Sequence, residues 1–315
     1  MRILVTGGAG FIGSHLCRSL LKNGDEVIAL DNLSTGSLDN IQDCLDSQKF
    51  EFVKHDVIEQ IYLEVDQIFN LACPASPIHY QRDPIFTMKT NVIGTLNMAN
   101  MATKLNIPLL QASTSEVYGD PQISPQPEEY WGNVNSYGVR SCYDEGKRAA
   151  EALLFDFRNK FDLNSRIARI FNTYGPRMQF NDGRVVSNFL VQSLSGQPIT
   201  IYGDGSQTRS LCYITDLIAG LIKLMNSKEK ITTPINLGNP NNFSILEIAN
   251  IILSHTNSNS KIIFKELPID DPKKRLPDIT KAKKILNWEP EISFNEGLSL
   301  MIEDFKARLK NLNVI

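Results

Sequence analysis

The chain has 315 residues, of which 42% are hydrophobic, and its formal net charge at pH 7 is −3. A chain of this length and composition can bury a sizeable core, as one large domain or as two lobes. The small negative charge gives no electrostatic reason to expect nucleic acid or an anionic membrane surface as a partner.

Cysteine and histidine usage indicates a reduced protein without a metal site. The five cysteines are scattered, odd in number and free of any C-x-x-C pair, which favours free thiols over a disulfide framework. The four histidines lack metal-ligand spacing, and no apolar run is long enough to span a bilayer. We therefore expect a cytoplasmic protein with no membrane segment and no metal.

The N-terminal segment predicts a strand, a Gly-rich turn at residues 6–13, a helix ended by Asn23-Gly24, and a second strand. The glycines permit a tight turn and close approach of a pyrophosphate, which the helix N-terminus can hold. Asp31, at the end of the second strand, is placed to accept hydrogen bonds from adenosine ribose hydroxyls. Asn32 follows it rather than an arginine, which favours NAD over NADP. An ordinary Gly-rich turn is the alternative, and the acid in place argues against it.

Strands and helices alternate along the next part of the chain. The predicted strands cover residues 50–53, 65–71, 108–112 and 165–170. The predicted helices cover residues 91–105 and 141–160. This alternation predicts an α/β fold, a Rossmann-type doubly wound parallel sheet with helices on both faces. In such a sheet Asp56 ends a strand near the adenine, and the small residues and prolines at 72–77 suit a loop that crosses under a dinucleotide.

The character of the chain changes after residue 171, where loops lengthen and polar residues interrupt the apolar runs. We therefore expect residues 1–171 to form an NAD-binding Rossmann domain, completed by part of residues 211–240. Residues 172–315 are expected to form mainly a smaller C-terminal α/β lobe that binds the substrate.

Tyr143 and Lys147 are four residues apart on the predicted helix 141–160, so both side chains project from one face. A phenol is a poor base at neutral pH, but an ammonium group one turn away and a bound nicotinamide cation would lower its pKa. The Thr114 hydroxyl, at a strand end, could hold the substrate oxygen that Tyr143 deprotonates. A surface pair is the alternative for Tyr-x-x-x-Lys taken alone, and the predicted NAD site favours the catalytic interpretation.

Further motifs identify a family. The Gly-rich turn, the Tyr143-x-x-x-Lys147 pair and Tyr202-Gly203-Asp204-Gly205 are typical of extended short-chain dehydrogenases/reductases that act on nucleotide sugars. Within that group the chain resembles the UDP-glucuronic acid decarboxylases (UDP-xylose synthases) over essentially its whole length. The segments more specific to this family are residues 71–77, 113–121, 142–148, 181–189 and 271–275.

The resemblance implies a carboxy-lyase that converts UDP-glucuronate into UDP-xylose and CO2 with a tightly bound NAD. C4 of the sugar is oxidised, with Tyr143 as base and Thr114 holding the oxygen, so that the carboxylate becomes β to a ketone and can leave. The retained NADH then returns its hydride to C4. The family also implies a nucleotide-sugar-binding second lobe and a homodimer joined by a four-helix bundle, which would use the helices beginning near Asn91 and Ser141.

The resemblance places Ser115, Glu116 and Arg275 beside the sugar ring and its carboxylate. Ser115-Glu116 stands where 4,6-dehydratases have Asp-Glu, so the acid needed for dehydration is missing. Arg275 can form a bidentate pair with a carboxylate or a phosphate. Glu116 would favour loss of the substrate carboxylate by like-charge repulsion or through an ordered water. A surface salt bridge for Arg275 and a strand-end hydrogen bond for Glu116 are the alternatives.

The predicted site residues form three groups. The predicted catalytic residues are Thr114, Ser115, Glu116, Tyr143, Lys147 and Arg275. The predicted NAD-binding residues are Gly7, Gly10, Phe11, Ile12, Gly13, Asp31, Asn32, Asp56, Val57, Leu71, Ala72, Asn91, Tyr143 and Lys147. The predicted substrate-binding residues are Pro74, Glu116, Asn172, Arg184, Val185, Tyr202, Gln207, Arg209 and Arg275. Arg209 suits the diphosphate and Tyr202 the uracil, with a structural role as the alternative for Tyr202 and Gln207.

Two other interpretations share these motifs. A nucleotide-sugar 4-epimerase or a UDP-apiose/xylose synthase would use the same scaffold, and Glu116 with Arg275 argues against plain epimerisation. A catalytically silent NAD-sensing or scaffold protein would usually lack the tyrosine or the lysine, whereas Thr114, Tyr143 and Lys147 are all present.

Overall fold

The structure is a computed structural model that describes residues 1–266 and 275–312. Its central feature is a sheet of seven strands in the order β11-β6-β5-β4-β1-β2-β3, with every neighbouring pair parallel. The strands are β1 (Arg2–Thr6), β2 (Glu26–Asp31), β3 (Phe50–Lys54), β4 (Gln67–Asn70), β5 (Leu109–Thr114), β6 (Ser165–Ile170) and β11 (Ile235–Leu237). This order confirms the predicted doubly wound α/β fold.

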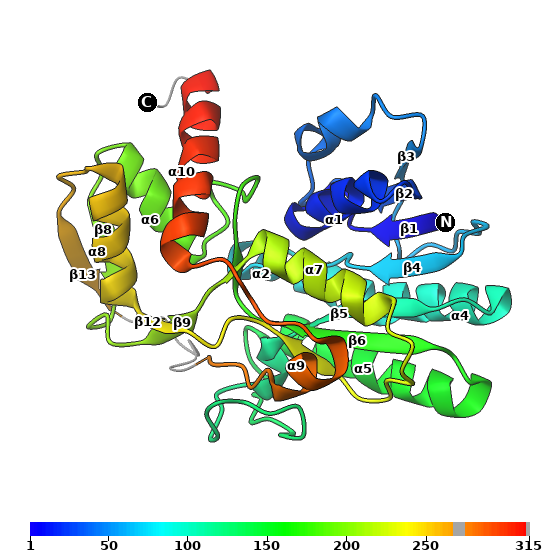
Figure 1. Cartoon of the computed structure of the whole chain (residues 1–315). Helices are drawn as coiled ribbons and strands as arrows, with labels where there is room; N and C mark the ends of the chain where they lie inside the picture. The colour runs from blue at the N-terminus through cyan, green and yellow to red at the C-terminus, as the bar shows by residue number, and fades with distance from the viewer. Residues whose placement is uncertain (267–274, 313–315) are drawn as a thin grey trace.

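Helices cover both faces of the sheet (Figure 1). The helices of one face are α1 (Phe11–Lys22) and α7 (Ile214–Met225), and those of the other are α4 (Thr95–Leu105) and α5 (Ser141–Phe161). Alternation along β1 explains the two layers, because Ile3 and Val5 belong to the core under α1 and α7, whereas Leu4 belongs to the core under α4 and α5.

The strand order reverses between β1 and β4, and a polar link joins their carboxyl ends. Thr6 Oγ1 donates to Asn70 Oδ1 at 2.6 Å and accepts from the backbone N of Leu71 at 3.1 Å. In a doubly wound sheet the crevice at such a reversal is where a ligand binds. This link therefore fixes the floor of the predicted cofactor site.

Two short helices occupy a stretch whose start had been predicted only as a loop. They are α2 (Pro77–Arg82) and α3 (Pro84–Lys89), and a π turn at Thr90–Gly94 joins α3 to α4. Each helix has proline near its start, where the missing N–H costs nothing. Asp83 caps α3 by accepting from Phe86 N at 2.9 Å. Short 3-10 turns lie at Leu38–Cys44 and Ser115–Tyr118.

A smaller group of elements lies beside the sheet, on the left of Figure 1. Its helices are α6 (Val185–Leu194), α8 (Ile245–Thr256) and α10 (Phe294–Asn311). Its strand pairs are β8 (Ile199–Tyr202) with β13 (Ile262–Lys265), and β9 (Thr208–Ser210) with β12 (Asn242–Ser244). A third short pair comprises β7 (Thr173–Tyr174) and β10 (Cys212–Tyr213), and α9 (Thr280–Leu286) contacts β11 and α7.

Within residues 1–266 and 275–312, no helix is long and apolar enough to cross a bilayer. The same residues contain no cluster of acidic, cysteine or histidine side chains that could hold a metal ion. All five cysteines are unpaired, as the sequence predicts, and Cys73 alone among them is not fully buried.

Candidate active site

A cavity of about 560 Å³ opens at the carboxyl ends of the strands and extends to the smaller group of elements. With one exception, every residue predicted for catalysis, cofactor binding or substrate binding lines it. The exception is Asn91, which is buried against Gly146 of α5 and donates to Thr87 O at 3.1 Å. The structure thus gathers predicted residues from many distant segments of the chain around one space.

The Gly-rich turn at the start of α1 fits a dinucleotide pyrophosphate. Gly7 has φ +68°, and a Cβ built on Gly13 would lie 2.0 Å from Gly7 O, so both positions require glycine. Gly10 caps α1 without a side chain, and the first turn carries no acidic residue. The first N–H groups of α1 are therefore open to an anion, whose charge the helix dipole favours.

Two acids stand at the ends of neighbouring strands, where an adenosine would lie. Asp31 accepts from Ala9 N at 3.1 Å and from Leu33 N at 2.8 Å. Burial raises the pKa of Asp31, and these two hydrogen bonds oppose that rise. Asn32 donates to Asp56 Oδ2 at 2.8 Å, which joins the ends of β2 and β3. Each carboxylate keeps lone pairs for ribose or adenine donors.

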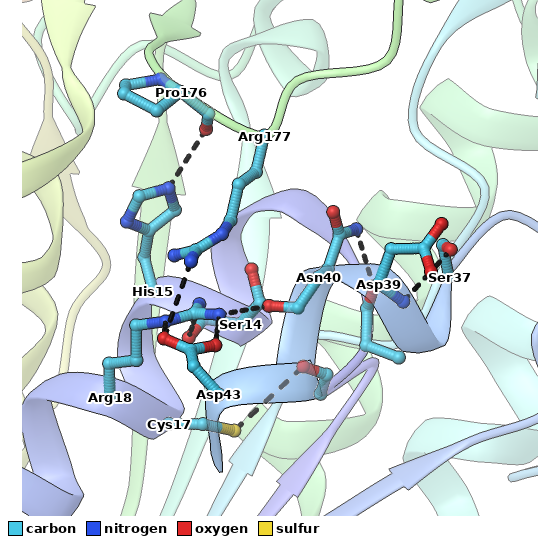
Figure 2. A network of polar contacts seen from close by, with 12 residues as sticks. Ser14, His15, Cys17, Arg18, Ser37, Asp39, Asn40, Asp43, Pro176 and Arg177 are labelled. Carbon is cyan, nitrogen blue, oxygen red and sulfur yellow. Dashed lines mark hydrogen bonds and ion pairs between the residues drawn. The ribbon is translucent and has the colours of Figure 1, made fainter. Parts of the chain in front are cut away.

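A polar network joins this end of the cavity to the segment that follows β7 (Figure 2). Arg18 of α1 donates to Asp43 Oδ2 at 2.7 Å, and Arg177 reaches the same oxygen at 3.4 Å. Beside the network, Gln179 donates to Thr35 O. Thr35 and Gln179 both line the cavity and were not predicted from the sequence. No local motif could reveal them, since their contact spans 144 positions.

Tyr143 and Lys147 project from the first two turns of α5 into the cavity, and both are buried. Lys147 Nζ donates to Ala112 O at 2.8 Å and lies 5.8 Å from the centre of the Tyr143 ring. Burial raises the pKa of Tyr143, which a hydrogen bond with Thr114 partly offsets. Burial also lowers the pKa of Lys147. The pair is internal, so the surface-pair alternative does not describe it.

A second tyrosine fixes the plane of the first. The ring of Tyr80, from α2, stacks on Tyr143 with centroids 5.0 Å apart and an angle of 9° between the planes. Tyr80 is almost fully buried, and its hydroxyl has no hydrogen-bond partner within the described residues. Tyr80 was not predicted, because Pro77, which begins its helix, is also typical of a loop.

Glu116 is turned into the cavity by the cap that Thr114 supplies, since Thr114 Oγ1 accepts from Glu116 N at 3.2 Å. Its Oε2 accepts from Arg275 Nη2 at 2.7 Å and from Arg140 Nη2. Burial alone would raise the pKa of Glu116, but these two arginines hold it at about 2. Arg275, 2% exposed, also donates to Gly119 O, so its alternative as a surface salt bridge does not apply.

Arg140 and Asp144 belong to the same cluster, and neither was predicted. Arg140 Nε lies 3.7 Å from Asp144 Oδ2, one helical turn further on. Burial and the neighbouring Glu116 raise the pKa of Asp144 to about 7, against the opposing effect of the arginines. The Arg-x-x-x-Asp spacing was the available signal, but it does not reveal the contact with Glu116, 24 positions away.

The far end of the cavity carries the residues predicted for the nucleotide. Arg184 donates to Ala75 O at 2.8 Å, and Gln207 Nε2 donates to Tyr202 O at 2.9 Å. Gln207 Oε1 is buried and lacks a partner within the described part of the chain. Gln207 therefore has a structural contact and also a free acceptor. Of the predicted motif 271–275, only Arg275 lies inside the described residues.

Comparisons with known proteins agree with this geometry. Residues 4–301 match the family described as GDP-mannose 4,6 dehydratase. The chain is 55% identical over 310 residues to UDP-glucuronic acid decarboxylase 5 of Arabidopsis thaliana, covering 98% of this chain and 90% of the relative. A UDP-glucose 4-epimerase structure from Thermotoga maritima, with UDP-glucose, has a TM-score of 0.90 at 30% identity and covers 98% of this chain and 100% of the other. A UDP-glucuronic acid 4-epimerase from Bacillus cereus, in complex with UDP-glucuronic acid and NAD, has a TM-score of 0.89 at 29% identity with the same coverage.

Proposed function

This chain belongs to the UDP-glucuronic acid decarboxylase family, and we propose that it converts UDP-glucuronate into UDP-xylose and CO2 with a tightly bound NAD. The observation that carries the proposal is the meeting of two groups in one cavity. Thr114, Tyr143 and Lys147 supply the oxidation chemistry, and the Glu116–Arg275 pair lies beside them.

The oxidation begins at the C4 hydroxyl of the sugar. NAD, when bound, accepts the hydride from C4 and later returns it. Tyr143 takes the hydroxyl proton, while Thr114 holds the same oxygen. Burial raises the pKa of Tyr143, so it needs positive charge nearby to act as a base. We assign this role to Lys147, whose Nζ lies 5.8 Å from the centre of the Tyr143 ring.

Carbon–carbon cleavage follows from the position of the new ketone. The carboxylate on C5 is β to the C4 carbonyl, so the electrons of the breaking bond can form an enolate as CO2 leaves. Tyr143, now protonated, and Thr114 donate hydrogen bonds to the developing oxyanion at C4. A proton from water at C5, the hydride returned to C4 and the proton returned by Tyr143 to the C4 oxygen then give UDP-xylose.

The Glu116 cluster refines the role predicted for Glu116. Two guanidinium groups compensate its charge, so like-charge repulsion of the substrate carboxylate is weakened. Both arginines use Oε2, and within the described residues no hydrogen bond occupies Oε1. Of the two predicted roles, holding an ordered water is therefore the better supported.

The assignment of the remaining site residues is part of the proposal. The Gly-rich turn, Asp31, Asn32 and Asp56 hold NAD, supported by the open α1 N-terminus and the linked acids. Arg184, Gln207 and Arg209 hold the UDP moiety, supported by their place at the far end of the cavity. Residues 1–171 with part of 211–240 form the NAD-binding domain, and residues 172–315 form mainly the nucleotide-sugar lobe. In support, α7 and β11, within 211–240, lie on the large sheet.

We also propose that the protein is a cytoplasmic homodimer joined by a four-helix bundle. The α3–α4 segment and α5 contact each other and expose Ile85, Ile93 and Phe155, which are 69%, 37% and 58% exposed. Exposed apolar side chains on a pair of helices are typical of a surface that is buried against a second copy of the chain. Five unpaired cysteines support a reducing compartment.

Light scattering tests the dimer. Phe155→Glu should yield a monomer, because a charge would be buried in the bundle. The matched control is Phe264→Glu, at a phenylalanine of β13 that is 57% exposed outside the bundle face. A dimer that survives Phe155→Glu but not Phe264→Glu would place the interface on the smaller lobe.

The reaction is tested by incubating the purified protein with UDP-glucuronate and identifying the nucleotide sugar by NMR. UDP-xylose without net accumulation of NADH is the expected result. The likeness to a UDP-glucuronic acid 4-epimerase makes epimerisation the second candidate. UDP-galacturonate as product would establish it, and no product at all would favour the silent scaffold.

A further inference from the structure

Arg140 lies between Glu116 and the Tyr80 ring that stacks on Tyr143. Its guanidinium group donates to Glu116, its Nε lies 3.7 Å from Asp144, and its carbon Cζ lies 5.9 Å from the centre of the Tyr80 ring. Tyr80 in turn stacks on Tyr143. The Arg140 side chain is 16% exposed and lines the cavity, so the cluster is largely shielded from solvent.

The charges in the cluster do not balance without a ligand. Two guanidinium groups meet one carboxylate oxygen, Glu116 Oε2. The remaining acid, Asp144, has its pKa raised to about 7 by burial and by Glu116. At neutral pH the cluster therefore keeps part of a positive charge for an incoming anion.

Arg275 has an unused donor that points to the same conclusion. Its Nε is buried and has no hydrogen-bond partner within residues 1–266 and 275–312, while Nη1 and Nη2 are engaged by Gly119 O and Glu116. A bidentate pair with a substrate carboxylate would use Nε and Nη2 together. Nη2 carries two N–H groups and can keep one on Glu116, but the charge of Arg275 is then divided between two carboxylates. A carboxylate in this shielded place cannot lose its compensation without a large cost.

We propose that Arg140 is a positioning residue that selects a carboxylate-bearing sugar by keeping Glu116 compensated while Arg275 also pairs with the substrate carboxylate. This inference rests on the proposed function, because it takes UDP-glucuronate as the substrate. Arg140 does not touch the sugar in this scheme and acts through Glu116. A sugar without the carboxylate leaves Arg275 on Glu116 and makes no demand on Arg140.

The test compares two ligands that differ by the carboxylate alone. Calorimetry measures the affinities of UDP-glucuronate and UDP-xylose for the NAD-loaded Tyr143→Phe protein, in which substrate binds without turnover. Adding Arg140→Met should weaken UDP-glucuronate roughly tenfold or more and leave UDP-xylose within about twofold. Adding Glu116→Gln as well should restore most of the loss, because no uncompensated carboxylate then remains.

The controls separate this effect from a general disturbance of the fold. Arg158→Met removes another arginine of α5, one that donates to Ser165 O at 2.7 Å and lies outside the cavity, and should change neither affinity. Arg140→Lys keeps a positive charge and should lose less affinity for UDP-glucuronate than Arg140→Met. The lysine variant replaces the methionine variant in the test if the latter does not fold.

Two outcomes would overturn the proposal. An equal loss for both nucleotide sugars would show that Arg140 only supports the fold. A loss for UDP-glucuronate that Glu116→Gln does not relieve would show that Arg140 does not act through Glu116. The NMR product assay on the unmodified enzyme reports on the decarboxylase function separately, so a failure there is distinguishable from a failure here.

Discussion

At the scale of single residues, the first proton transfer is the role that we propose for the buried Tyr143 hydroxyl. Tyr143→Phe removes the hydroxyl and keeps the ring stacked on Tyr80. Turnover should fall by about 10²–10⁴-fold, the usual contribution of a positioned acid–base group. Bound NAD should be retained. The rate of UDP-xylose formation measures turnover, and the absorbance of NAD in the purified protein measures its retention.

The matched control for this prediction is Tyr62→Phe, which removes the hydroxyl of a tyrosine that is 52% exposed. It should leave turnover unchanged. Full turnover in Tyr143→Phe with NAD still bound would transfer the base role to another group in the cavity.

Asp144 gives a prediction about pH. In the folded chain, burial and Glu116 raise its pKa from 3.8 to about 7. Asp144 contributes its full stability at a pH below the pKa that it has in the unfolded chain. That stability is lost as the pH rises through the pKa that it has in the folded chain, because the unfolded chain ionises first. Asp144→Asn should remove that loss. The difference in unfolding free energy, variant minus parent, should therefore grow by on the order of 1–3 kcal/mol from about pH 5 to about pH 8.

Urea unfolding at the two pH values measures this difference. The control is Asp156→Asn, which changes an exposed acid of the same helix and should follow the parent at both values. A pH dependence of stability in Asp144→Asn that equals that of the parent would mean that Asp144 is ionised in the folded chain throughout.

At the scale of elements, the turn from β1 into α1 depends on a contact that only glycine allows. A Cβ on Gly13 would lie 2.0 Å from Gly7 O, so Gly13→Ala must push the turn apart. We expect a loss of about 3 kcal/mol in unfolding free energy and of most bound NAD. Thermal unfolding and the NAD content of the purified protein measure both effects.

Gly24→Ala is the control for backbone strain without a clash. Gly24 has φ +87° and nothing within 4 Å of a built Cβ. The substitution should cost about 1–2 kcal/mol and leave NAD content unchanged. Equal NAD loss in the two variants would mean that general destabilisation, and not the turn, explains the result of Gly13→Ala.

Elements were predictable from the sequence where the pattern is local. One continuous segment contains strand β1, the Gly-rich turn, helix α1 with its end at Asn23-Gly24, and strand β2 with its terminal acid. The structure confirms these predicted elements. The helices α2 and α3 were not predicted: Pro77 was assigned to the loop 72–77 and residues 78–90 to no element, although proline also starts helices. The short strands of the smaller group could not be placed individually, since β8 pairs with β13 more than 50 positions away.

The site shows the same limit. Thr114, Tyr143 and Lys147 follow from strand-end and helix spacing, and the cavity brings them together. Arg140 and Gln179 act through partners 24 and 144 positions away, and no periodicity encodes such contacts. The family resemblance supplied Arg275, which spacing alone could not assign.

At the scale of the whole molecule, the cavity lies where the large sheet and the smaller group of elements meet, and contacts between the two close it over the cofactor end. His15 of α1 donates to Pro176 O at 2.9 Å, and its pKa is lowered to about 4 chiefly by burial, so the ring stays neutral. Arg177 N donates to Asp304 of α10 at 3.0 Å. The segment after β7 is thus held from both sides, and Figure 2 shows Pro176 above His15 and Arg177 directed at Asp43. Gln179, further along the same segment, donates to Thr35 O.

A reaction that returns its hydride needs a cofactor that does not leave between steps, and this closure supplies a reason for retention. Gln179→Met breaks the contact with Thr35 O while it keeps the length of the side chain. NAD should dissociate roughly tenfold faster, because the variant lacks one of the contacts that must open before NAD can leave. The time course with which turnover decays after NAD-loaded protein is diluted into buffer without NAD measures this rate. Gln122→Met changes an exposed glutamine outside the cavity and should retain NAD as the parent does. If Gln179→Met weakens UDP-glucuronate binding with no change in NAD release, then Gln179 serves the sugar end of the cavity and not the closure over the cofactor.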